Sequence, residues 1–212
     1  MIEGCTAALR KVAAALWFLP LAASLSGLAH AETAPGSQPA RAGFSLLAPQ
    51  EASLRFSYGI GDRDSLRFYS LGARGAYDLL PDLIPAIAGN RLRWVLELGG
   101  SFIHGDGHSR DGEFAFSPLI FDWRYDAGQR VVPFIDGGEG LVLTSLKGVH
   151  IGGPFEFSSQ AGGGLHLFLT NEDALTVAVR YRHISNAGIK QENSGLNTFF
   201  VVFGWSHFAD RQ

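Results

Sequence analysis

The most chemically suggestive part of the sequence is the tripeptide His183-Ile184-Ser185. In an extended strand, side chains two residues apart share a face, so the imidazole and the hydroxyl would stand side by side. An adjacent imidazole can accept the hydroxyl proton and make a serine nucleophilic. The alternative is a histidine at a strand end, followed by a serine that opens a turn. The spacing indicates nucleophilic catalysis without establishing it.

The residues before this pair indicate where it lies. Apolar side chains occupy odd positions from Leu175 to Tyr181, polar or small ones occupy the even positions, and His183 and Ser185 continue the odd series. If that face looks into lipid, a polar pair is costly there unless it lies at the interface or has a function. A strand tilted by about 45° rises on the order of 20 Å between Leu175 and His183, which reaches the outer head-group level.

Similar alternation recurs along the chain, and eight segments with strand character lie between turn signals. They cover residues 53–61, 64–77, 91–103, 112–124, 130–145, 154–169, 173–186 and 196–208. Several exceed the roughly 5–6 residues usual in soluble strands and suit the roughly 9–11 needed to cross a bilayer at a tilt. The sequence therefore predicts an all-β fold, an eight-stranded antiparallel transmembrane β-barrel.

Closing the barrel removes edge strands, whose unpaired backbone groups would each cost several kcal/mol in hydrocarbon. Eight strands enclose a space that their own side chains can fill, so charged residues should pair inside, which argues against a porin. These residues are Arg55, Arg93, Glu97, Glu156, Arg180 and Arg182. A soluble lipocalin-like barrel with its apolar face inward is the competing interpretation. An export signal, the strand lengths and aromatic residues near strand ends favour the membrane. Those aromatic residues are Tyr69, Tyr77, Trp94, Trp123, Tyr181 and Trp205.

The connections differ in length in the way that is typical of outer-membrane barrels, with short inner turns and longer outer loops. The short turns are residues 125–129 and 170–172, and the longer loops are 104–111, 146–153 and 186–195. The 78–90 segment, with two prolines, is too long for an inner turn under this rule.

The N-terminal region has the features of a signal peptide. Arg10 and Lys11 precede an apolar run that ends at Leu28, and Ala29-His30-Ala31 supplies the small residues of a cleavage site. An N-terminal membrane anchor is the alternative, but the run is short and contains proline and glycine. We assign residues 1–31 to the signal peptide, 32–50 to a flexible linker and 51–212 to the barrel.

Composition excludes two classes of protein. The 212 residues contain 17 Lys and Arg against 20 Asp and Glu, for a net charge of -3. We therefore expect no nucleic-acid partner. Since 46% of the residues are hydrophobic and only 17% charged, the chain is not intrinsically disordered.

The stretch from Arg182 to Gly188, followed by Asn193, Gly195 and a final aromatic strand, resembles the lipid A 3-O-deacylase (PagL-like) family of outer-membrane esterases. The resemblance implies a hydrolase of the bacterial outer membrane that removes the ester-linked acyl chain at the 3-position of lipid A in lipopolysaccharide. In that family pattern, Ser185 is the nucleophile and His183 the general base. Asn186 and the backbone N–H of Gly188 donate to the oxyanion, and Asn193 has a structural role in the loop.

The family's catalytic acid, fourteen residues after the histidine, is replaced by Asn197. Asn197 occupies an odd position, as do the apolar residues of the last strand, so it lies on the same face and can meet His183 and Ser185. An amide oxygen can orient the imidazole, but it cannot offset the imidazolium charge. Replacing the acid by its amide in a serine protease costs about 10⁴-fold in rate, so we expect weakened activity unless another group helps. Glu192, in the adjacent loop, is the auxiliary acid that the sequence offers.

Other patterns carry less weight. The stretch His104-Gly105-Asp106-Gly107-His108 could bind a metal, but no further ligand elsewhere has a readable spacing, and a glycine-rich polar external loop explains the stretch better. We therefore expect no metal and no cofactor. Lipid A and outer-membrane lipid are the expected partners, and homodimer formation is left open. The alternative functions are a non-catalytic outer-membrane barrel with a structural or binding role and, more remotely, an acyltransferase.

Overall fold

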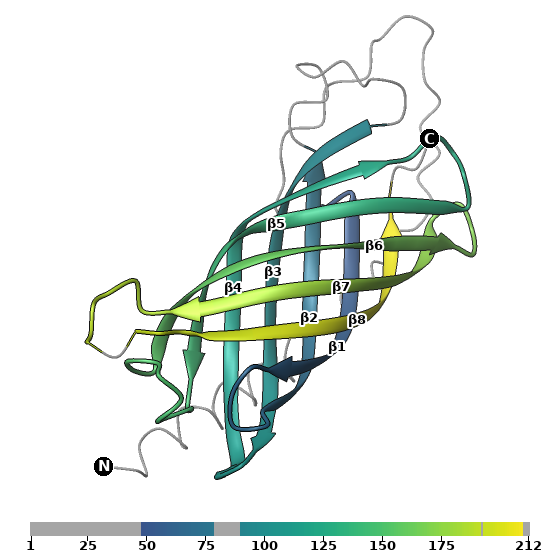
Figure 1. Cartoon of the computed structure of the whole chain (residues 1–212). Coiled ribbons are helices and arrows are strands. Elements are labelled where there is room, and N and C mark those ends of the chain that lie inside the picture. Colours follow the sequence, from purple (N-terminus) through teal and green to yellow (C-terminus); the bar gives the residue numbers. More distant parts are fainter. Residues whose placement is uncertain (1–47, 79–89, 192, 210–212) are drawn as a thin grey trace, which may run out of the picture. The chain divides into compact units, whose positions relative to one another are not determined.

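The structure is a computed structural model that describes residues 48–78, 90–191 and 193–209. Within these ranges, eight strands form a closed barrel in which each strand is antiparallel to its neighbours and β8 pairs with β1 (Figure 1). The strands are β1 (Glu51–Gly61), β2 (Arg67–Asp78), β3 (Asn90–Gly105), β4 (His108–Tyr125), β5 (Val131–Thr144), β6 (Phe155–Phe168), β7 (Asp173–Ser185) and β8 (Leu196–Phe208). The all-β fold, the strand number and the antiparallel closure are confirmed. Among the described residues, no helix is long and apolar enough to cross a membrane.

The strand boundaries differ from the expected ones most clearly at two connections. The predicted outer loop at 104–111 is wrong, because β3 and β4 continue almost to the tip and leave only Asp106 and Gly107 between them. Gly107, at φ 77°, allows this tight turn. The predicted start of β2 at residue 64 is also too early, because Asp64 and Ser65 have positive φ and form the turn itself. The signal peptide, nearly all of the linker and residues 79–89 lie outside the described residues.

The two faces of the strands separate as predicted for a membrane barrel. Val179 and Phe199 are 63% and 66% exposed on the outside, whereas Arg93 is fully buried inside. Trp123 and Trp205 are exposed as expected of aromatic residues near the membrane interfaces, but Tyr77 is buried. The outward apolar face is one that lipid can cover.

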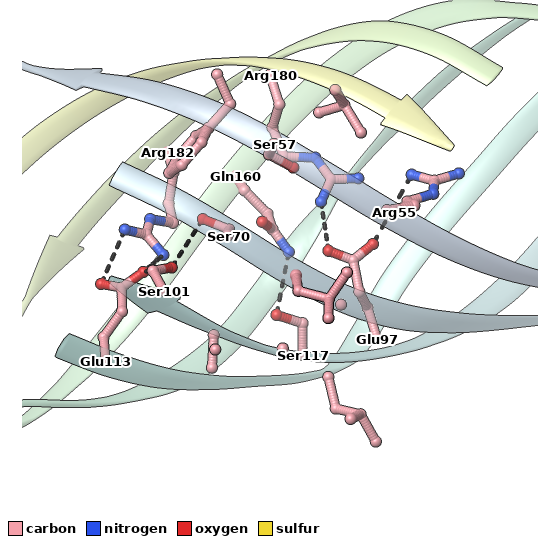
Figure 2. A pocket seen from close by; sticks show the side chains of 18 of the residues that line it. Arg55, Ser57, Ser70, Glu97, Ser101, Glu113, Ser117, Gln160, Arg180 and Arg182 are labelled. Carbon is pink, nitrogen blue, oxygen red and sulfur yellow. Dashed lines mark hydrogen bonds and ion pairs between the residues drawn. The ribbon is translucent and has the colours of Figure 1, made fainter. Parts of the chain in front are cut away.

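Charged side chains pair across the lumen, as the sequence predicted (Figure 2). The ion pairs include Arg93 with Glu51 and Asp122, Arg74 with Asp122 and Asp136, Arg180 with Glu97 and Asp136, Arg182 with Glu113, and Arg55 with Glu51 and Glu97. Glu156 differs from the prediction, because its carboxylate accepts a hydrogen bond from the N–H of Gly153 in the loop before β6. Arg55, Glu97, Arg180, Arg182 and Glu113 line a cavity of about 80 Å³, so the barrel is filled largely by its own side chains.

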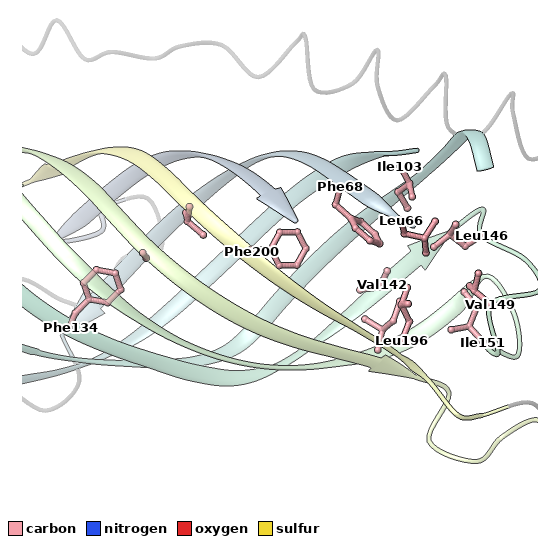
Figure 3. Close-up of a cluster of buried hydrophobic side chains, with 13 residues drawn as sticks. Leu66, Phe68, Ile103, Phe134, Val142, Leu146, Val149, Ile151, Leu196 and Phe200 are labelled. Carbon is pink, nitrogen blue, oxygen red and sulfur yellow. The ribbon is translucent and has the colours of Figure 1, made fainter. Parts of the chain in front are cut away.

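Near the outer loops, the lumen is closed by an apolar cluster (Figure 3). Its members include Leu66, Phe68, Ile103, Val142, Leu146, Val149, Ile151, Ile184 and Leu196. Ile184 lies between His183 and Ser185 in sequence, and Leu196 precedes Asn197. Burial of these two inward residues orients β7 and β8 so that their sequence neighbours His183, Ser185 and Asn197 face outward.

Candidate active site

The centre of the site is a cross-strand contact between β7 and β8. His183 and Asn197 are directly paired in the register of the two strands. Their side chains meet on the outward face, with Nδ1 of His183 2.8 Å from Oδ1 of Asn197. The two positions of the family's histidine and acid are therefore in hydrogen-bond contact.

Ser185 lies on the same outward face of β7, two residues beyond His183, and both side chains are partly exposed. Within the described part of the chain, no hydrogen bond joins the Ser185 hydroxyl to the imidazole. Catalytic hydrogen bonds are often long in a free enzyme and shorten when substrate binds. The structure therefore places the predicted nucleophile and the predicted base on one face, and a side-chain movement would be needed to bring them into hydrogen-bond contact.

Asn197 has more partners than the sequence indicated. The Tyr181 hydroxyl donates to its Oδ1 at 2.6 Å, and its Nδ2 donates to Oδ2 of Asp62 at 2.6 Å. Tyr181 was predicted only as an interfacial aromatic residue. Its position two residues before His183, on the same face of the strand, could have indicated this contact. Nothing in the local sequence marked Asp62 as a site residue, because it lies beside Asn197 only where β1 pairs with β8 to close the barrel.

The predicted oxyanion donors lie in the tight turn that follows β7. The Ile189 N–H donates to the Asn186 carbonyl at 3.1 Å, and Ala187 and Gly188 between them have φ of 53° and 81°. The Gly188 N–H donates to Oδ1 of Asn186 at 3.0 Å. Since this N–H already has an acceptor, it must exchange that acceptor for substrate before it can bind an oxyanion.

The outer loop is held by two residues that follow this turn. Asn193 accepts the Asn186 N–H through its side-chain oxygen at 2.8 Å, which is the structural contact expected of it. Gly195 donates its N–H to the carbonyl of His150 at 3.3 Å, joining two outer loops. Glu192, the predicted auxiliary acid, lies outside the described residues.

One histidine of the β3–β4 hairpin, His108, has acidic partners close by. His108 Nδ1 lies 2.8 Å from Asp111, and its Nε2 lies 3.8 Å from Asp64. Among the described residues, no group of three or more histidine, cysteine or acidic side chains could hold a metal ion.

The fold and the outward arrangement define the class of protein: an outer-membrane β-barrel that carries a serine, a histidine and an asparagine together on its lipid-facing wall. Residues 72–206 match the family model described as Lipid A 3-O-deacylase (PagL), a span of more than half the chain. The chain belongs to this family.

Two curated relatives agree with that assignment. Lipid A deacylase PagL of Bordetella bronchiseptica is 30% identical over 169 residues, which cover 73% of this chain and 83% of the relative. Lipid A deacylase PagL of Pseudomonas aeruginosa is 29% identical over 102 residues, covering 47% of this chain and 56% of the relative.

Solved structures support the fold. The crystal structure of the outer membrane enzyme PagL matches with a TM-score of 0.61 at 24% identity, covering 72% of this chain and 97% of that one. Neisserial surface protein A matches with a TM-score of 0.54 at 13% identity, covering 74% of this chain and 94% of that one. The eight-stranded barrel is therefore shared by proteins whose sequences differ widely.

Proposed function

We propose that this chain hydrolyses the ester that holds the acyl chain at the 3-position of lipid A, with Ser185 as nucleophile and His183 as general base. Family membership supports the substrate and the reaction. The observation that carries the residue roles is the 2.8 Å contact between Nδ1 of His183 and Oδ1 of Asn197 on the outward face. An imidazole anchored through Nδ1 presents Nε2 as the base.

In the first half of the reaction, Nε2 of His183 takes the hydroxyl proton as Oγ of Ser185 attacks the ester carbonyl. The tetrahedral intermediate collapses when His183 returns that proton to the sugar oxygen, which leaves as a hydroxyl group. The acyl chain is then bound to Ser185 as an ester. His183 next takes a proton from the water that attacks the acyl carbon, and returns it to Oγ as the bond between Ser185 and the acyl group breaks. The two halves together yield a free 3-hydroxy fatty acid and lipid A with a free 3-hydroxyl.

The position of the site suits an amphiphilic substrate. His183 and Ser185 follow the apolar outward series of β7, near the outer end of the strand. Tyr181 and Phe199 lie beside them with ring centroids 5.1 Å apart, and Phe199 and Ile189 are 66% and 70% exposed. An acyl chain can pack on this apolar surface while its ester lies at the level of the polar pair, so substrate can arrive by lateral diffusion in the membrane.

Oxyanion stabilisation is assigned to the turn after β7. Asn186 and the Gly188 N–H are the donors that this proposal uses, and each such donor contributes about 3–4 kcal/mol in a serine protease. Their mutual hydrogen bond holds the turn in its left-handed conformation before substrate binds. A carbonyl oxygen that becomes negatively charged is a stronger acceptor than the Asn186 amide, which favours the exchange.

The test is the mass of lipid A before and after incubation with the purified protein in detergent. The wild type should release a 3-hydroxy fatty acid, and Ser185→Ala should release none. Ser159 is the matched control, because it is also exposed on the outward face and is directly paired with His183 from β6, yet its hydroxyl is bonded to Glu139 at 2.8 Å. Full activity of Ser185→Ala, or loss in Ser159→Ala alone, would overturn the nucleophile assignment.

The same measurement separates the alternatives. A non-catalytic barrel would leave the acyl pattern unchanged, and an acyltransferase would add mass to an acceptor. The polar pair that continues the apolar outward series of β7, held by an orienting amide, favours hydrolysis over a purely structural role.

A further inference from the structure

Asp62 follows the last residue of β1 and lies beside the start of β8. The Asp62 N–H donates to the Asn197 carbonyl at 3.0 Å, so the backbone pairing of β1 with β8 continues to this residue. In return, the Asn197 N–H donates to Oδ1 of Asp62 at 3.2 Å, and Nδ2 of Asn197 donates to Oδ2 at 2.6 Å. One carboxylate thus binds both the backbone and the side chain of Asn197.

This contact determines which way the Asn197 amide points. An ionised carboxylate only accepts hydrogen bonds, so the amide group that faces Asp62 must be NH₂. The opposite side of the amide is then the carbonyl oxygen, which faces Nδ1 of His183 and also accepts from the Tyr181 hydroxyl. No other orientation satisfies both neighbours.

The amide orientation in turn determines the imidazole tautomer. A carbonyl oxygen cannot donate, so Nδ1 of His183 must carry the ring proton and Nε2 is left as an acceptor. If the amide were reversed, its NH₂ group would face Nδ1. The ring proton would then lie on Nε2, which could no longer take a proton from Ser185.

We infer that Asp62 is a positioning residue for the proposed hydrolysis: through Asn197 it sets the tautomer of His183. The chain from Asp62 through Asn197 to His183 thereby performs the orienting task of the histidine–acid pair from which this sequence departs. The inference rests on the proposed function for its catalytic meaning. The hydrogen-bond chain itself does not depend on it.

Orientation rather than charge is the contribution of Asp62. Its side chain is 39% exposed and lies 3.8 Å from the Arg63 guanidinium, so solvent and a cation both weaken its field at the imidazole. Its two hydrogen bonds to Asn197 act at short range and are retained in that setting. The expected signature is therefore a change in kcat and in tautomer, with KM little affected.

The first test measures Asp62→Asn in two backgrounds. In the wild type, Asp62→Asn should lower kcat by about tenfold or more, yet by less than the roughly 10⁴-fold seen when the directly bonded acid of a serine protease is made an amide. In the Asn197→Asp background, the new carboxylate at residue 197 binds His183 directly, and no amide is left there to be oriented. There, Asp62→Asn should leave kcat unchanged or raise it by removing a repulsive neighbour.

Equal losses in both backgrounds would show that Asp62 only supports the loop, and no loss in the wild type would show that it does nothing for catalysis. Either result overturns the inference. Asp64→Asn is the control, since Asp64 is a more exposed carboxylate in the same turn and its positive φ suits asparagine. It should keep wild-type kcat.

The second test reads the tautomer without any reaction. Nitrogen-15 NMR of the full chain in detergent micelles should show the neutral His183 ring protonated on Nδ1. Asp62→Asn should add a population protonated on Nε2. A wild-type ring with its proton on Nε2 overturns the inference even if the enzyme is active, whereas full activity of Ser185→Ala overturns the proposed function and leaves the tautomer result standing.

Discussion

Gly195 lies against the edge of the His183 imidazole that carries Nε2. A Cβ atom at this position would be 2.4 Å from Cε1 and 2.8 Å from Nε2, and also 2.7 Å from the Ile184 carbonyl oxygen. Gly195 also has φ of 68°, which side chains other than glycine rarely adopt. The absence of a side chain at residue 195 is therefore what leaves room for the ring beside Ser185.

Gly195→Ala should abolish hydrolysis, because the new methyl group displaces the imidazole from its position against Asn197. Gly148→Ala is the matched control: residue 148 has φ of 75°, but a Cβ there meets nothing within 4 Å. Both variants carry a backbone strain of about 1–2 kcal/mol, and only the methyl group of Gly195→Ala collides with the His183 imidazole. Similar activity in the two variants would contradict this account. Fatty-acid release and thermal unfolding would be measured side by side.

Tyr181→Phe removes one of the two donors to Oδ1 of Asn197. A hydrogen bond of this kind contributes about 0.5–1.5 kcal/mol, so kcat should fall several-fold while His183 keeps its own bond to the amide. Tyr69→Phe, on the outward face of β2, should retain wild-type activity. A loss as large as that of Ser185→Ala would instead give Tyr181 a direct part in the chemistry.

Exchanging the carboxylate at residue 62 with the amide at residue 197 should raise kcat. The double variant Asp62→Asn with Asn197→Asp places a carboxylate on Nδ1 of His183 and an amide behind it, which preserves the hydrogen bonds of the chain. The directly bonded carboxylate stabilises the imidazolium that forms in the transition state. We expect kcat above the wild-type value by about tenfold or more, and a value below wild type would contradict the proposed order of groups.

Ile184→Ala should destabilise the barrel through the apolar cluster near the outer loops. Ile184 is fully buried, and removing this much of a buried side chain costs about 2–5 kcal/mol. Because it lies between His183 and Ser185, activity should be lost at a lower temperature than in the wild type. Val179→Ala, at a position 63% exposed on the outward face, should change stability much less in a denaturant titration.

The sequence alone predicted the fold and half of the site. Period-two alternation is local, and burial against lipid or lumen acts on each strand separately, so strand number and sidedness could be predicted without knowing any partner. The shared face of His183 and Ser185 follows from the same local geometry. Asn197 was found by its fourteen-residue spacing from His183, and cross-strand pairing confirms that the two meet.

Tertiary structure decided what lies around these residues. Asp62 reaches Asn197 only because β1 closes onto β8 in one particular register, which joins residues 135 positions apart. The contact of Gly195 with His183 and the internal bond of the Gly188 N–H depend on the path of the outer loop, which no periodic pattern encodes. Local alternation specifies which face a side chain takes, whereas its neighbours across the barrel depend on register and loop conformation, which are set by packing of the whole chain.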